Sequence, residues 1–170
     1  MAAGEKRKNI RLSEENVNFR MMNLIRKVHG MIDDPDIEKH RHSQNQVGAF
    51  LGNQKDVLIT PIKIKDMEAE WICANRVHMK KYVILYCHGG GYSTGSRIYA
   101  RTLTDKLAQS TSMDVLCFDY RLSPENPYPA ALEDALKVWD YLMLYGYGAR
   151  DVIIAGDSAG GNLALSLTLK

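Results

Sequence analysis

Three cysteines are all that this sequence of 170 residues holds. Their number is odd and no Cys-x-x-Cys pair occurs, which argues against a disulfide framework and against a zinc site. All three lie in apolar runs typical of strands, so we expect reduced core residues at Cys73, Cys87 and Cys117. We predict no metal and no cofactor.

The sequence also lacks long apolar runs and an excess of charge of either sign. No run approaches the roughly 20 residues of a membrane-spanning helix, and the amino terminus has no apolar core of a signal peptide. The formal net charge is only +2 at pH 7, which does not favour nucleic-acid binding or strong attraction to a membrane. We therefore predict a cytoplasmic protein with no nucleic-acid partner and no stable membrane anchor.

The most informative stretch covers residues 151–161, where a short apolar run leads directly into Gly156-Asp-Ser-Ala-Gly160. This segment fits the pattern G-x-S-x-G, and a helix-like stretch follows it. A serine in such a turn is held in a strained backbone conformation, and side chains on both flanks would collide with the neighbouring strand and helix. We predict that the Ser158 hydroxyl projects above the sheet as a nucleophile.

A second motif, His88-Gly-Gly-Gly91, directly follows the apolar run at residues 82–87. Acyl transfer needs backbone N–H groups aimed at the oxyanion that forms during the reaction. One comes from the residue after the nucleophile, here Ala159, and the others come from a loop after an earlier strand. Glycines in that loop let the backbone approach the substrate closely. The two motifs, in this order and each after a strand, indicate an ester-cleaving site.

Three segments together resemble the hormone-sensitive-lipase-type branch of the α/β-hydrolase esterases. They are His88-Gly-Gly-Gly-Tyr92, Asp119-Tyr-Arg-Leu-Ser-Pro-Glu125 with Pro129-Ala-Ala-Leu-Glu-Asp134, and Gly156-Asp-Ser-Ala-Gly-Gly161. The resemblance covers the chain from about residue 55 onward. It implies a serine carboxylesterase or lipase acting on small-molecule esters with short-to-medium acyl chains.

The resemblance also implies a role for each motif residue. Ser158 would be the nucleophile, with oxyanion donors in the amides of Gly89, Gly90 and Ala159, and with His88, Gly91 and Asp157 in support. The family uses the histidine at the position of His88 to shape the turn. We expect Asp157 to brace the site through hydrogen bonds. The charged residues Asp119, Arg121 and Glu125 are expected to form an ion-paired corner that positions their loop, rather than to supply the catalytic acid.

One departure from the family is that no histidine follows Ser158, although the catalytic acid and histidine come after the nucleophile in these enzymes. The five histidines of the sequence are His29, His40, His42, His78 and His88. None can be assigned as the general base, so we expect an amino-terminal portion of an esterase that is nearly inactive alone. We further expect an exposed sheet edge that pairs with a complementary carboxyl-terminal chain or with itself.

Two other functions are alternatives to ester hydrolysis. A non-catalytic small-molecule-binding member of the same fold would keep the pocket without the base, and it stays open as the alternative. A dinucleotide-binding domain is excluded because Thr94 stands where G-x-G-x-x-G needs its third glycine. The sequence has no phosphate loop of the type G-x-x-x-x-G-K-[ST] either.

The order of the expected elements predicts an α/β fold, with a mostly parallel central sheet between two layers of helices. The sheet would lack its carboxyl-terminal strands. Residues 1–53 are interpreted as a helical amino-terminal arm that forms a lid, with a linker at residues 44–53, and residues 54–170 as the hydrolase core. Expected strands lie at 57–64, 67–73, 82–87, 115–118 and 152–155, and expected helices at 99–110, at 130–145 and from 162. Alternation in the second strand predicts a wetter face that carries Glu68 and Glu70.

Overall fold

A computed structural model describes residues 36–52, 56–77 and 81–170. The chain divides into two compact units, Met1–His40 and Arg41–Lys170. The sheet, the site and the contacts discussed below all belong to the second unit. Residues 1–35 of the predicted helical arm lie outside the described residues, so the lid function of the arm stays a prediction.

Five strands form one mixed sheet in the described part of the chain. They follow the order β1-β2-β4-β3-β5. The first two pairings are antiparallel, and β4, β3 and β5 run parallel to one another. The prediction of a mostly parallel sheet therefore holds for these three strands, which lie beside the site. The strands are β1 (Val57–Ile64), β2 (Met67–Ala74), β3 (Val83–Cys87), β4 (Asp114–Phe118) and β5 (Val152–Gly156).

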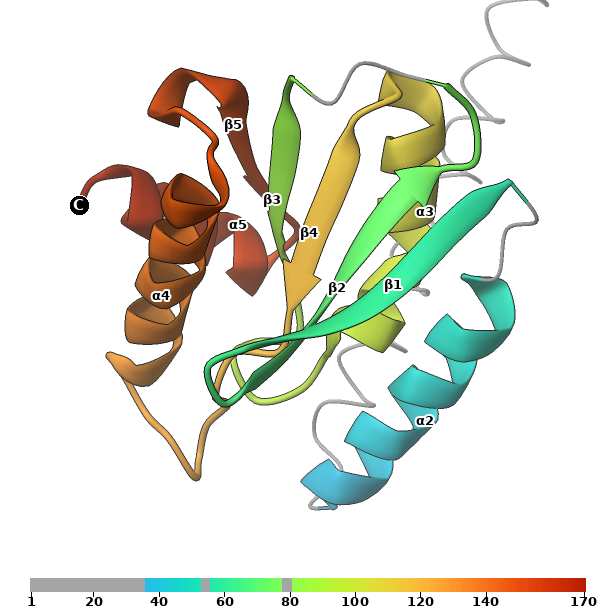
Figure 1. The fold of residues 1–170 in the computed structure, drawn as a ribbon. Helices are drawn as coiled ribbons and strands as arrows, with labels where there is room; N and C mark the ends of the chain where they lie inside the picture. Colours follow the sequence, from blue (N-terminus) through green and yellow to red (C-terminus); the bar gives the residue numbers. More distant parts are fainter. Residues whose placement is uncertain (1–35, 53–55, 78–80) are drawn as a thin grey trace, which may run out of the picture. The chain divides into compact units, whose positions relative to one another are not determined.

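Helices cover both faces of this sheet (Figure 1), which confirms the three-layer α/β-hydrolase architecture. α3 (Arg97–Thr111) packs on one face, and α4 (Ala130–Tyr145) and α5 (Ala159–Thr168) pack on the other. β3 and β4 are buried along their whole length because helices cover both of their faces. α4 turns alanine, valine and leucine side chains inward at helical spacing, as its sequence predicts.

The predicted linker at residues 44–53 is wrong for most of its length, because α2 (Ile37–Leu51) continues through it. Gly48, which suggested a loop, is buried where the helix meets the start of α3. A Cβ atom there would lie only 2.3 Å from the carbonyl oxygen of Ile98. The glycine is therefore explained by close contact between two backbones and not by chain flexibility.

The predicted wetter face of β2 is also wrong at Glu70, whose side chain is fully buried under α3. Both of its carboxylate oxygens accept hydrogen bonds from the Arg101 guanidinium, at 2.9 and 2.6 Å. A buried carboxylate needs such a partner to offset the loss of its hydration. The alternating pattern therefore marks a buried ion pair.

β5 lies at the edge of the described sheet (Figure 1). It is less covered than β3 and β4, and Ile153 is 46 % exposed. Within the described ranges, no helix combines the length and the apolar character needed to cross a bilayer.

Candidate active site

Ser158 lies in the turn between β5 and α5, with backbone angles φ 50° and ψ −122°. This conformation is rare for a residue with a side chain and indicates strain. A Cβ atom on Gly160 would lie 2.1 Å from the carbonyl oxygen of Cys87, and one on Gly156 would lie 2.4 Å from that of Gly160. The turn thus packs so tightly against β3 that both flanking positions require glycine. Ser158 itself is exposed.

The glycine loop after β3 and the serine turn after β5 meet at the same end of the sheet. Cys87 pairs with Gly156 in the parallel register, so the two strands end side by side. The Asp157 carboxylate then accepts a hydrogen bond from the amide of Gly89 at 2.9 Å and another from the Tyr86 hydroxyl at 2.8 Å. Asp157 therefore joins the two loops.

The glycine loop is a tight turn with two glycines in the left-handed half of conformational space. Gly90 has φ 124° and Gly91 has φ 62°, angles that glycine adopts without steric cost. The carbonyl of Gly90 accepts the amides of Ser93 at 3.1 Å and Thr94 at 2.9 Å, which closes the turn. Exposure increases along it: Gly89 is buried, Gly90 half-buried and Gly91 exposed.

His88 is a structural part of this loop. Its ring is buried, stacks on Tyr120 with centroids 4.1 Å apart, and donates from Nδ1 to the carbonyl of Gly89 at 2.9 Å. The Tyr120 hydroxyl donates in turn to the backbone carbonyl of His88 at 2.6 Å. Burial lowers the pKa of the His88 imidazole below its ordinary value. These contacts support the turn and do not present the ring to Ser158.

The lowered pKa of His88 predicts that the protein loses stability when the pH falls below about 6.5. In that range the imidazole binds a proton in the unfolded chain but not in its buried position. The free energy of unfolding therefore falls by up to about 1.4 kcal/mol per pH unit. Urea unfolding at pH 7.5 and pH 5 measures this loss. The variant His88→Asn keeps a donor for Gly89 and should lose less stability over the same interval. Equal losses in both proteins would contradict the assignment to His88.

The three charged residues of the connection after β4 each pair with a different element, as expected of a loop that is positioned by ion pairs. The pairs are Asp119 with Arg97, Arg121 with Asp134, and Glu125 with Arg41. Within the described residues, none of these carboxylates is hydrogen-bonded to Ser158. Their role in the described residues is to hold the connection between β4 and α4.

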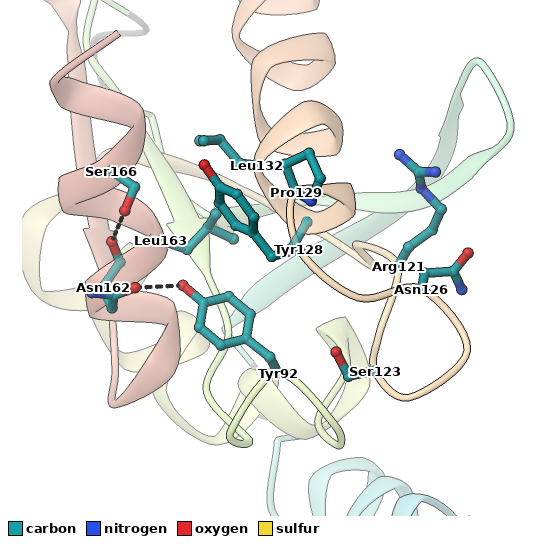
Figure 2. Close-up of a pocket in the computed structure, with 11 residues that line it drawn as sticks. Tyr92, Arg121, Ser123, Asn126, Tyr128, Pro129, Leu132, Asn162, Leu163 and Ser166 are labelled. Carbon is teal, nitrogen blue, oxygen red and sulfur yellow. Dashed lines mark hydrogen bonds between the residues drawn. The ribbon is translucent and has the colours of Figure 1, made fainter.

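A pocket of about 180 Å³ lies beside the first turns of α5. Figure 2 shows the Tyr92 phenol pointing toward Asn162, whose side-chain oxygen accepts its hydroxyl proton at 2.8 Å. Asn162 and Ser166 follow Ser158 at intervals of four residues, so the three lie along one side of the helix. The pocket therefore begins roughly 6 Å along the helix from the serine.

The lining of this pocket is mostly apolar and was missed by sequence reasoning. Leu132, Leu163 and Tyr128 border it together (Figure 2). The guanidinium of Arg121, which also borders it, is bound by Asp134 at 2.9 Å. The four-residue spacing of the polar residues after the serine was the one signal that could have pointed to the pocket.

The described residues offer neither a metal site nor a base bonded to the serine. No group of three or more His, Cys, Asp or Glu side chains in the described part is placed to hold a metal ion. In the second unit, the two described histidines bond elsewhere: His42 accepts from Gln46 at 3.0 Å, and His88 donates within its own loop.

The sequence profile of a family described as alpha/beta hydrolase fold matches residues 84–170. The chain is 40 % identical to an esterase of Acinetobacter venetianus over 114 residues, which are 67 % of this chain and 37 % of that protein. It is 33 % identical to an acetyl-hydrolase of Streptomyces hygroscopicus over 131 residues, which are 77 % of this chain and 43 % of that protein.

Solved structures of esterases are also similar to this chain. The crystal structure of an esterase from the bacterial hormone-sensitive lipase family matches with a TM-score of 0.75 and 31 % identity, over 87 % of this chain and 49 % of that one. The esterase EstE5, in a crystal soaked with p-nitrophenyl butyrate, matches with a TM-score of 0.74 and 32 % identity, over 80 % of this chain and 45 % of that one. The chain therefore spans less than half the length of these proteins.

Proposed function

Because the chain belongs to the α/β-hydrolase fold family, in its hormone-sensitive-lipase-type esterase branch, we propose that it carries the nucleophile and the oxyanion donors of a carboxylic-ester hydrolase. The observation that supports this most is the strained, exposed Ser158, set in a turn that Asp157 ties to the glycine loop. Its Oγ would attack the ester carbonyl carbon, and the carbonyl electron pair would move onto oxygen. When that intermediate collapses, the alcohol leaves with the proton that the Ser158 hydroxyl gave up. Water then releases the acid and restores the serine.

We revise one part of the expected oxyanion hole. The amide of Gly89 already donates to Asp157 at 2.9 Å and is buried, so it is not available to a substrate. The next two glycines are progressively more exposed. We therefore assign the donors to the amides of Gly90, Gly91 and Ala159, the last at the positive end of α5.

The pocket beside α5 supports a short, neutral group on the substrate. Its volume of about 180 Å³ is close to that of a dry cavity of about 150 Å³ that binds benzene. The guanidinium of Arg121 is neutralised by Asp134 and Glu133, so the pocket has no unpaired charge at Arg121 to attract a charged group. We propose that the pocket takes an acyl or alkyl group no larger than a phenyl ring.

A substitution that distorts the glycine loop should lower the rate of ester hydrolysis. A Cβ atom on Gly90 would lie 2.2 Å from the carbonyl oxygen of Thr94, at a φ of +124°. We expect Gly90→Ala to reduce p-nitrophenyl butyrate hydrolysis above the buffer rate about 100-fold, the cost of one lost oxyanion donor. The KM should stay nearly constant because the donors act in the transition state.

The matched control for this variant is Gly146→Ala. Gly146 follows α4, also has a positive φ (+112°), and has no atom within 4 Å of an added Cβ. It carries the same backbone penalty without contact with the loop. Equal rates in the two variants would refute the oxyanion assignment.

A non-catalytic binding protein of the same fold is the second candidate. It is favoured by the two described histidines of the second unit, His42 and His88, which both bond to groups other than Ser158. Such a protein would bind esters in the pocket but would show no hydrolysis that depends on the glycine loop, which the comparison of the two variants would reveal.

A further inference from the structure

One face of α2 contacts the exit of the glycine loop. Arg41, Gln44 and Asn45 lie three and four residues apart, and side chains at this spacing share one side of a helix. The Nε of Arg41 donates to the carbonyl of Ser93 at 2.9 Å, and the side-chain oxygen of Gln44 accepts the amide of Gly95 at 2.9 Å. We call these three residues the α2 clamp.

The third residue of the clamp reaches the start of the next helix. The side-chain oxygen of Asn45 accepts the hydroxyl proton of Ser96. That hydroxyl also accepts the amide of Tyr99 at 3.2 Å and so caps the first turn of α3. The clamp therefore holds the loop up to the point where α3 begins.

Arg41 also binds the connection between β4 and α4. Its guanidinium donates to the carbonyl of Ser123 at 3.0 Å and to both carboxylate oxygens of Glu125 at 3.0 and 2.9 Å. The amide of Ser123 in turn donates to the carbonyl of Tyr92 at 2.7 Å. Only a planar fork of N–H groups satisfies several fixed acceptors in this way. The side chain is 18 % exposed, so water screens these bonds only in part.

The strained part of the loop thus lies between two anchors. Asp157 holds the front at Gly89, and the α2 clamp holds the back from Ser93 to Ser96. Between them, Gly90, Gly91 and Tyr92 all have positive φ. Such a conformation persists only where the surroundings fix it.

We propose that Arg41, Gln44 and Asn45 are positioning residues that set the amides of Gly90 and Gly91 for an oxyanion. The catalytic meaning of this inference rests on the proposed function. Its structural meaning, that α2 fixes the loop, is independent of any turnover and can be measured separately.

Residue-resolved amide hydrogen exchange of the full chain tests the structural meaning. In Arg41→Met we expect the amides of Ser93, Thr94 and Gly95 to exchange at least tenfold faster than in the unaltered chain. The amide of Gly89 should keep its protection because Asp157 still holds it. No change, or an equal acceleration in the loop and in the strands, would overturn the proposal. Arg150→Met, which removes an exposed arginine from the short 3-10 helix before β5, is the control and should leave the loop unchanged.

Hydrolysis of p-nitrophenyl butyrate tests the catalytic meaning. We expect Arg41→Met to lower kcat about tenfold at constant KM. Arg41→Lys should not restore kcat, because one ammonium group cannot bind both loops. Faster exchange with an unchanged kcat, or full rescue by lysine, would refute the positioning role. If the unaltered chain shows no turnover above buffer, the proposed function fails and the exchange pattern alone decides whether the clamp exists.

Discussion

The 170-residue chain should hydrolyse p-nitrophenyl butyrate about a million times more slowly than an esterase with a complete triad. A serine hydroxyl is a weak nucleophile at neutral pH unless an adjacent base takes its proton. No histidine is bonded to Ser158 in the described residues, and His88 is buried in its own loop. What remains is the contribution of the oxyanion donors and of substrate binding, about 10³-fold over water.

The dependence of this slow rate on individual residues is also predicted. Residues of a triad act as a unit, so removing the serine from a chain without a working base costs little more. Ser158→Ala should therefore change the slow rate by less than about threefold, whereas Gly90→Ala removes most of it. A chain that is fully active alone, and inactive as Ser158→Ala, would contradict this account.

At the edge of the described sheet, β5 offers a strand for pairing with a chain that carries a catalytic acid and histidine. Ile153 is half exposed there, and an unpaired strand edge is a template for pairing. Mixing the chain with the carboxyl-terminal half of a relative, such as the Acinetobacter venetianus esterase, should raise the rate if the two halves pair. The rise should be lost in Ser158→Ala, because the serine would now have its base.

The sequence predicted best those features that steric contact dictates. Residues 82–87 and 152–155 read as strands because buried parallel strands are continuous apolar runs, and the structure places β3 and β5 there. The glycines around Ser158 followed from the collision that a Cβ would cause, and the distances at Gly156 and Gly160 agree. Such patterns leave few alternatives.

The sequence predicted poorly those features that depend on a distant partner. Glu70 read as exposed because its partner Arg101 is 31 residues away and lies on a helix. Gly48 read as a linker because nothing local shows that α3 lies against it. The amide of Gly89 read as a free donor because its bond to Asp157 spans 68 residues. In each case the deciding contact is tertiary.

Gly160→Ala should destabilise the protein by about 3 kcal/mol or more, although alanine is the better helix former by about 1 kcal/mol. Gly160 is buried in the first turn of α5, and the added Cβ would lie 2.1 and 2.4 Å from the carbonyl oxygens of Cys87 and His88. These are backbone atoms, so relief requires α5 and β3 to move apart. The midpoint of urea unfolding should fall by about 1–2 M.

Gly161→Ala is the matched control, one residue further along the same helix. Its Cβ would lie 3.3 Å from its nearest neighbour, the carbonyl oxygen of Gly156, so the small crowding and the gain in helix propensity should nearly cancel. In Gly160→Ala the displaced carbonyls belong to the residues that lead into Gly89, so the glycine loop would shift with them. Equal stability of the two variants would mean that the serine turn does not pack against β3. The amides and the serine would then not face a common substrate, and the proposed chemistry would lose its geometric basis.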